Sequence, residues 1–223
     1  MTSAPAPAPI APAAPVAASA NPAFAKVASD ERVARAAAGV SARGMTAEIV
    51  ADGAAAKARV IALLPSGATV FTSQSDTLTT IGLAAEINDS GRFDAIRPKI
   101  MKLDRVTQRR EIKKLAATPD FVVGSAAAVT EDGEIMVASG SGSQIGHFTY
   151  EADKVILVIG AQKIVRDAAE GLRRIEEYSL PLESERMQKL YGRPSSLNKI
   201  LTIRRDNPPD RTTVIFVKER LGY

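Results

Sequence analysis

The 223-residue chain contains no cysteine, no tryptophan and only one histidine, His147. Without cysteine it cannot form disulfide bonds, hold zinc or iron–sulfur clusters through thiolates, or use a cysteine nucleophile. A single histidine leaves few ligand sets for a transition metal. No apolar run reaches the roughly 18 residues that a transmembrane helix needs. We therefore expect no metal site, no cofactor bound through cysteine and no membrane association, while the identity of any other cofactor stays open.

Neither sign of charge dominates, since 29 Lys and Arg residues oppose 25 Asp and Glu residues and give a net charge of +4. This small excess is spread along the chain and does not indicate a nucleic-acid partner. A hydrophobic fraction of 45% and a charged fraction of 24% are ordinary for a globular protein, and the length fits one domain.

Proline is concentrated at the start of the chain, at Pro5, Pro7, Pro9, Pro12 and Pro15. This spacing excludes a helix and predicts a disordered or polyproline-II tail over residues 1–23, followed by a single domain over 24–223. The stretch has no basic segment before its apolar residues, and its prolines interrupt any signal-like run. We therefore expect a cytoplasmic protein.

Helical and strand patterns alternate along the rest of the chain. Ser29 is placed to cap a helix whose apolar residues recur at helical spacing, and short runs closed by glycine, such as 155–159, are typical of buried parallel strands. The predicted helices are 29–44, 54–64, 77–88, 104–117, 167–180 and 183–191, and the clearest predicted strands are 45–50, 68–71, 121–123, 155–159, 198–204 and 212–217. The last two are joined by a loop long enough for a hairpin turn. This order predicts an α/β domain with a mostly parallel sheet flanked by helices.

In the predicted helix 167–180, Ala168, Leu172 and Ile175 are expected to face inward, and Arg173 and Arg174 outward.

Two polar loops follow predicted strands, where open α/β sheets place their ligands. The loop after 68–71 offers hydroxyl groups and opens a helix, whose first N–H groups and positive dipole end favour an anion. The loop over 139–144 alternates serine with glycine, which permits backbone amides to converge on one point. The candidate ligand-binding residues are Ser73, Ser75, Thr77, Ser141, Gly142, Ser143, Gln144 and Lys163. The alternative is that both loops are ordinary turns, with Asp76 a plain helix N-cap.

Lys163 follows Gly160 closely at the end of a predicted strand, where its charge could hold a carboxylate or phosphate; the alternative is a surface lysine. Glu131 and His147 are weaker, catalytic candidates, Glu131 or its neighbour Glu134 as a nucleophile and His147 as an acid or base. The more economical account of the carboxylates is a hairpin turn with its tight corner at Asp132-Gly133 and with Glu131 and Glu134 exposed. The alternative for His147 is a packed or hydrogen-bonded histidine. The basic residues of the predicted helix 104–117 fit either a solvated face or an anion-binding or partner surface.

Three stretches together resemble the lactate-utilisation domain family, and in particular the lactate utilization protein C group. They are GATVFTSQSDTLTTIGL (67–83), the run TPDFVVGSAAAVTEDGEIMVASGSGSQIGHFTYEADKVILVIGAQKIVRD (118–167) and TTVIFVKERLGY (212–223). The ordered combination of T-E-D-G, S-G-S-G-S-Q, G-x-x-K-I-V and a terminal L-G-Y is the most specific part of the resemblance.

The resemblance implies a fold like that of the sugar-phosphate isomerase and coenzyme-A transferase superfamily, and a part in L-lactate oxidation, for some members beside partner subunits that carry iron–sulfur clusters. Some relatives carry a cysteine cluster before the final strands, but here the region reads KLYGRPSSLNKILTI (189–203), without cysteine. Any redox cofactor is thus expected on a partner protein.

Three interpretations remain open. The first is a subunit that binds a small carboxylate or phosphorylated ligand and serves an oxidation carried by partners. The second is a stand-alone enzyme that acts on a coenzyme-A thioester, a sugar phosphate or a nucleotide-activated substrate through Glu131 or His147. The third is a structural dimer whose loops bind nothing; a homodimer is compatible with each.

Overall fold

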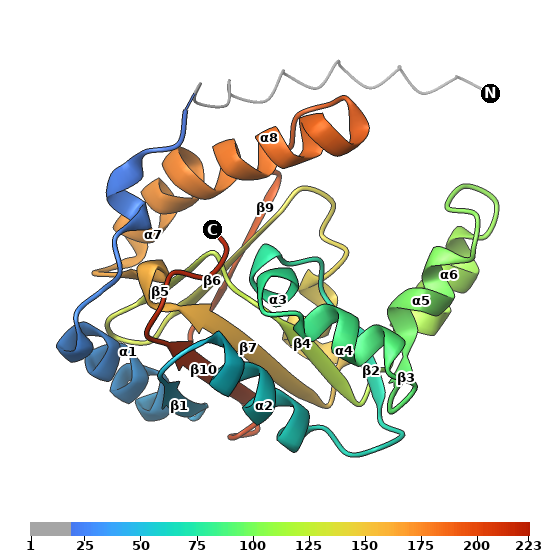
Figure 1. Cartoon of the computed structure of the whole chain (residues 1–223), viewed down its shortest axis with the longest axis horizontal. Coiled ribbons are helices and arrows are strands. Elements are labelled where there is room, and N and C mark those ends of the chain that lie inside the picture. The colour runs from blue at the N-terminus through green and yellow to red at the C-terminus, as the bar shows by residue number, and fades with distance from the viewer. Residues whose placement is uncertain (1–18) are drawn as a thin grey trace, which may run out of the picture.

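The computed structural model of the protein describes residues 19–223 (Figure 1). The predicted tail therefore lies almost wholly outside the described residues. Its last residues contribute to Pro22–Ala25, a short 3-10 turn capped by the Asn21 side chain.

A six-stranded sheet, in which every neighbouring pair is parallel, forms the centre of the domain in the order β1-β10-β7-β4-β2-β3. Its strands are β1 (Thr46–Val50), β2 (Thr69–Thr72), β3 (Asp94–Ala95), β4 (Phe121–Gly124), β7 (Lys154–Gly160) and β10 (Thr212–Val217). The α/β class with a parallel, helix-flanked sheet is confirmed.

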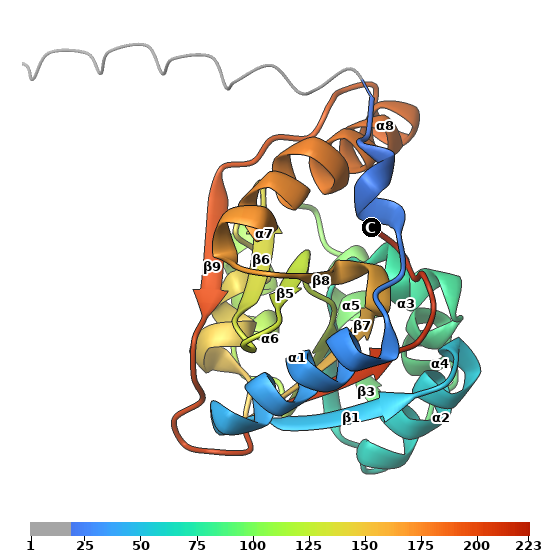
Figure 2. The same ribbon diagram turned by 90° about the vertical axis from the view of Figure 1, so that its left-hand side faces the viewer.

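The sheet buries both faces, as its near-continuous apolar strands require. On β7, Val155, Leu157 and Ile159 pack with α1 (Asp30–Ala42) and the apolar residues of a second, smaller sheet. Ile156 and Val158 alternate to the other face, where they pack with α2 (Gly53–Leu63), α3 (Asp76–Thr80) and α4 (Leu83–Asp89). Helices thus line the sheet on both sides (Figures 1 and 2).

The smaller sheet has the order β8-β5-β6-β9. Its strands are β5 (Ala128–Thr130), β6 (Ile135–Ser139), β8 (Ile164–Val165) and β9 (Lys199–Ile203). β5 and β6 form an antiparallel hairpin, so the tight corner predicted at Asp132-Gly133 is confirmed. The expected hairpin between the last two strands is wrong: β9 is partly exposed and pairs with β6, whereas β10 is buried between β1 and β7.

The backbone of the β5–β6 corner lies against the backbone of α1. A Cβ on Gly39 would lie 2.4 Å from the carbonyl carbon of Asp132, and one on Gly133 would lie 2.2 Å from that of Gly39. Real Cβ atoms do not approach backbone this closely, so both positions need glycine. This contact fixes the small sheet against the helix layer.

The last helices differ from expectation. α7 (Ala168–Arg174), a π-helical turn (Ile175–Ser179) and α8 (Leu180–Tyr191) follow one another without a break instead of forming two separate helices. The predicted inward face is also wrong in part, since Ala168 and Leu172 are exposed while Arg174 is fully buried. The spacing of apolar residues does not predict which face of this helix is buried, because an arginine occupies a buried position.

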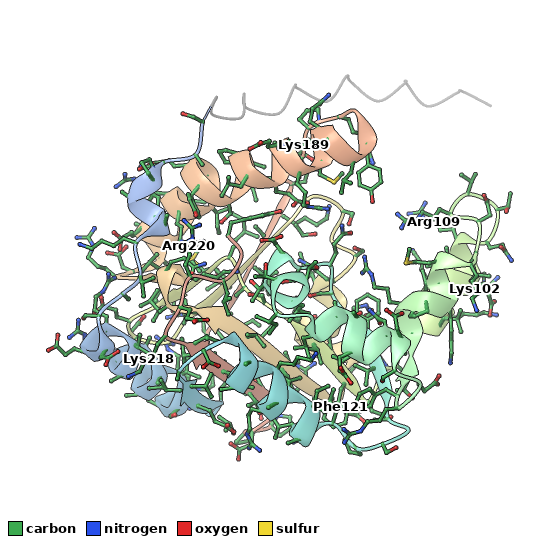
Figure 3. All side chains as sticks on the ribbon, viewed as in Figure 1. Lys102, Arg109, Phe121, Lys189, Lys218 and Arg220 are labelled. Carbon is green, nitrogen blue, oxygen red and sulfur yellow. The ribbon has the colours of Figure 1, made fainter. Side chains whose placement is uncertain are left out.

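Two other helices are shorter than predicted. Gly82, with a φ of +66°, separates α3 from α4 where one helix was expected. The basic helix is limited to α6 (Arg109–Ala116), because the Asp104 side chain accepts hydrogen bonds from the backbone of the turn before it. Together with α5 (Ile96–Met101), α6 extends from the body, and Figure 3 shows Lys102 and Arg109 on this arm. Within residues 19–223, no helix has both the length and the apolar character to span a membrane.

Candidate functional site

A cleft of about 1050 Å³ lies where the carboxyl ends of β2, β4 and β7 meet. Parallel strands bring the loops that follow them to one edge of the sheet, which is where open α/β sheets bind ligands. The 139–144 loop after β6, α8 and the C-terminal residues complete its walls. In Figure 1, the C-terminus lies between α8 and the sheet.

The cleft brings together seven of the eight residues predicted to bind a ligand. These are Ser73, Ser75, Thr77, Ser141, Ser143, Gln144 and Lys163. Gly142 is not among the lining residues, although its φ of +83° shapes the loop that presents its neighbours. The loops at 73–77 and 139–144 are far apart in sequence, and the sheet places them on one cavity. Ser75 is the residue before α3 and Asp76 lies in its first turn, so the N-cap predicted at Asp76 is displaced by one residue.

Lys163 lies at the wall of this cleft with only 2% of its surface exposed, so the alternative of a surface lysine is wrong. Its Nζ donates hydrogen bonds to Thr77 Oγ1 at 2.9 Å and to Ser125 Oγ at 3.1 Å. Each hydroxyl in turn donates to a backbone carbonyl, Thr77 to Leu221 at 3.1 Å and Ser125 to Val158 at 2.7 Å. Because their hydrogens are committed, both hydroxyls present lone pairs to Nζ.

Burial, together with repulsion by the Arg174 guanidinium, lowers the pKa of Lys163 to about 7. The Asp76 carboxylate on α3 opposes this shift. Near neutral pH the amino group is therefore divided between its ammonium and amine forms. The ammonium form offers a positive charge to an anion, and the amine form offers a free lone pair.

Arg174 is a second buried cation, held by backbone and hydroxyl acceptors. Its guanidinium donates to the carbonyls of Ala127 and Gln162 and to Ser179 Oγ. Burial lowers the pKa of Arg174 to about 10, which leaves it charged at neutral pH. It thus fixes the loop after β4 to the loop after β7 and acts on Lys163 through its charge.

The C-terminal residues reach the cleft through Gln162. The Gln162 side chain donates to the carbonyls of Leu221 and Gly222, at 2.9 and 3.0 Å, and accepts from Leu221 N. Tyr223 then lies on the cleft beside α8, where its hydroxyl donates to Glu183 and accepts from Arg186 Nε at 3.2 Å. Burial raises the pKa of Tyr223, so its phenol stays protonated. The sequence analysis did not predict Tyr223 as a residue of the cleft. The terminal L-G-Y of the family resemblance was the feature that pointed to it.

Glu131 does not line the cleft. Its carboxylate accepts hydrogen bonds from Arg32 Nε at 2.6 Å and Arg35 Nε at 2.8 Å, both on α1. Burial opposes the shift, but these two bonds hold the pKa of Glu131 below its usual range. An ionised carboxylate held by two guanidinium groups is a poor nucleophile. The position of Glu131 fits a structural role, in which it links the β5–β6 hairpin to α1.

His147 is buried in a π-helical turn (His147–Glu151). Its ring packs against Phe71 with 4.1 Å between centroids, and Nδ1 lies 2.7 Å from Glu151 Oε2. Burial lowers the pKa of His147, while Glu151 opposes that shift. The side chain is absent from the cleft lining, which matches the packed alternative better than the catalytic one.

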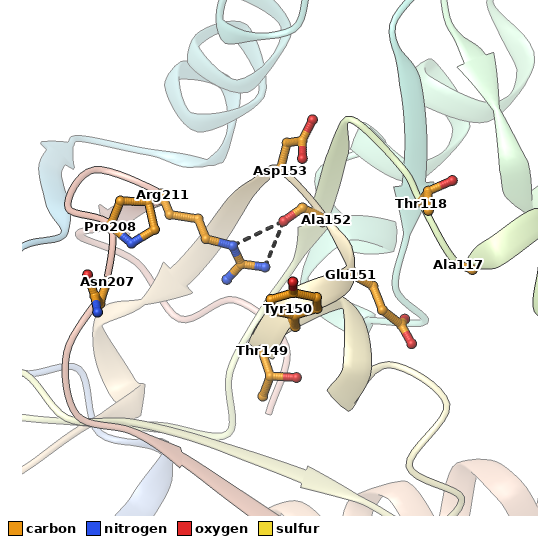
Figure 4. A pocket seen from close by; sticks show the side chains of 10 residues that line it. All are labelled: Ala117, Thr118, Thr149, Tyr150, Glu151, Ala152, Asp153, Asn207, Pro208 and Arg211. Carbon is orange, nitrogen blue, oxygen red and sulfur yellow. Dashed lines mark hydrogen bonds between the residues drawn. The ribbon is translucent and has the colours of Figure 1, made fainter.

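A second cavity of about 580 Å³ lies at the opposite, amino-terminal edge of the sheet (Figure 4). Arg211 is the basic residue that lines this cavity, and its guanidinium donates to the backbone carbonyls of His147, Phe148 and Ala152. Because that guanidinium serves the fold, the strand-end cleft is the better candidate site. Among residues 19–223, no group of three or more His, Asp or Glu side chains is placed to hold a metal ion.

Comparison with known proteins agrees with this fold. The family model of the LUD domain matches residues 33–217. A crystal structure of a DUF162 family protein from Deinococcus radiodurans is similar with a TM-score of 0.52 and 13% sequence identity, over 86% of this chain and 99% of that one. At this identity the likeness concerns the fold alone. No curated protein matches the chain.

Proposed function

The chain belongs to the LUD domain family and is thus a lactate-utilisation-related protein, and from this premise we propose that its strand-end cleft binds a small carboxylate or phosphorylated ligand. The protein would serve as a binding or accessory subunit of L-lactate oxidation. Its redox cofactors would then lie on partner proteins, among them iron–sulfur subunits, since the chain has no cysteine to hold a cluster.

One observation carries the proposal. Lys163 is buried at the wall of the cleft, beside two hydroxyl groups and no directly bonded carboxylate. Burying a cation without a bonded counter-ion costs free energy, and a lysine with a perturbed pKa in a cleft is a candidate for a functional site. The serine and threonine side chains around it supply further donors that suit carboxylate or phosphate oxygens.

Ligand affinity should depend on pH. An anion beside Lys163 stabilises the ammonium form and raises the pKa of Lys163 above its value of about 7 in the free protein. Binding then takes up a proton, so affinity is greatest below pH 7 and falls by up to about tenfold per unit as pH rises toward the pKa of the complex.

The test is isothermal titration calorimetry with L-lactate, pyruvate, sugar phosphates, coenzyme A and acyl-coenzyme A, after a thermal-shift screen of the same compounds. At about 100 times its dissociation constant, a ligand stabilises the native state by roughly 2.7 kcal/mol. The Lys163→Met variant should lose binding. The matched control is Lys189→Met on α8 (Figure 3), where the side chain is 72% exposed and pairs with Glu185. No binding of any compound by the wild-type protein, or equal binding by Lys163→Met, would contradict the proposal.

The stand-alone enzyme remains the alternative function. Under it, Glu131→Ala and His147→Ala abolish turnover of a coenzyme-A thioester, sugar phosphate or nucleotide-activated substrate. Under the binding function, both variants keep ligand affinity, because neither side chain lines the cleft. If neither ligand affinity nor turnover is found, the remaining interpretation is a structural dimer, which sedimentation velocity detects.

A further inference from the structure

We propose that Lys163 forms a protonated imine with a small carbonyl compound that carries a carboxylate, a 2-oxo acid being the simplest. This inference rests on the proposed binding function and adds a covalent step to the same site.

The geometry around Nζ supports this role. A neutral lysine amine has two N–H bonds and one lone pair. Thr77 Oγ1 and Ser125 Oγ both act as acceptors, because their own hydrogens are donated to backbone carbonyls. The two N–H bonds are thereby satisfied, and the remaining position on a nitrogen at the cleft wall is its lone pair. With both N–H bonds taken, this lone pair is the group that nucleophilic attack on a carbonyl needs.

The charges around Nζ keep part of the amine neutral. Burial, the largest cause, and Arg174 on α7 disfavour the ammonium, and together they outweigh Asp76 on α3, which favours it. At pH 7.5, a lysine whose pKa is about 7 has on the order of several hundred times more neutral amine than an exposed lysine of pKa 10.5.

The step balances without an oxidant or reductant. The Nζ lone pair attacks the carbonyl carbon and forms a C–N bond, while the carbonyl π electrons move to oxygen, which takes up a proton. The resulting hydroxyl takes up the proton that Nζ gives off and leaves as water, so that amine, carbonyl and one proton give a protonated imine and water. The product restores a positive charge at the position of the ammonium, next to the ligand carboxylate. The hydroxyls of the loops at 73–77 and 139–144 are the donors available to that carboxylate.

The test is reductive trapping of the full chain at pH 7.5 with pyruvate and sodium cyanoborohydride, followed by intact mass and peptide mapping. We expect one adduct per chain, on the peptide that contains Lys163, formed on the order of a hundredfold faster than at any other lysine. L-Lactate, which has no carbonyl carbon to attack, should give no adduct. Lys189→Met should react like the wild type.

Two variants at position 163 keep the test decisive. Lys163→Met and Lys163→Arg should both lose the fast adduct, and the arginine variant keeps a cation if the methionine variant does not fold. Adducts spread evenly over surface lysines, at the same rate in these variants as in the wild type, would overturn the imine. If calorimetry shows pyruvate binding but no adduct forms, the imine is wrong and the binding function stands. If pyruvate neither binds nor reacts while another anion binds, the imine alone fails, and if no compound binds, both proposals fail.

Discussion

Replacing Lys163 by methionine should remove a pH dependence from the stability of the protein. The pKa of Lys163 falls from 10.5 in the unfolded chain to about 7 in the folded protein. Between these two values the unfolded chain binds one more proton than the folded protein, so stability contributed by this residue rises with pH. The difference of about 3.5 units corresponds to roughly 5 kcal/mol, the folding free energy lost when the side chain must carry its charge below pH 7.

Urea unfolding at pH 6.5 and at pH 9.5 measures this directly. Over that interval the free energy of unfolding of the wild type should rise by about 3 kcal/mol relative to that of Lys163→Met, whose side chain has no proton to exchange. Thr77 and Ser125 keep their bonds to backbone carbonyls in the variant, so their cost is the same at both pH values. Parallel stabilities of the two proteins at all pH values would refute the depressed pKa of Lys163.

Other positions give further expectations. Gly39→Ala should destabilise the fold by roughly 1–3 kcal/mol in urea unfolding, because the new Cβ meets the backbone of Asp132 at 2.4 Å; unchanged stability would place the hairpin farther from α1. Arg174→Met leaves three buried acceptors without their donor and should lower the free energy of unfolding by about 3 kcal/mol. In protein that stays folded, the pKa of Lys163 should rise because the repulsion by Arg174 is lost, and NMR titration measures this change. Glu131→Ala removes partly exposed ion pairs and should lower the free energy of unfolding by no more than about 1 kcal/mol. Ligand affinity measured by calorimetry should stay the same, and a loss of affinity would show that Glu131 contributes to the binding site.

The layers of the fold follow from local patterns. The helix capped by Ser29 and the apolar runs that become β4 and β7 follow rules that act within a few residues, and the structure has all of them. The two hydroxyl-rich loops were predictable for the same reason, since both follow strands. Their meeting on one cleft depends on parallel strands sharing an edge, which the α/β class already implies.

What sequence reasoning missed depends on contacts between distant segments. Arg174 was expected at the surface, but its buried position needs acceptors from residues 127 and 162, which no local pattern reveals. Likewise β9 and β10 are neighbours in sequence yet belong to different sheets, because β10 is apolar enough for a central position and β9 is not. The contact of Tyr223 with Glu183 and Arg186 spans some 40 residues and has no periodicity to predict it.

The central claim is that Lys163 is a buried amine at an anion-binding cleft. Its most direct test is an NMR titration of protein with ¹³Cε-labelled lysine, with Lys163→Met used to assign the signal, in the absence and presence of a ligand found by calorimetry. We predict a pKa of about 7 for Lys163 in the free protein and a higher pKa in the complex. A pKa near the ordinary value of 10.5 that does not change with ligand would contradict the account.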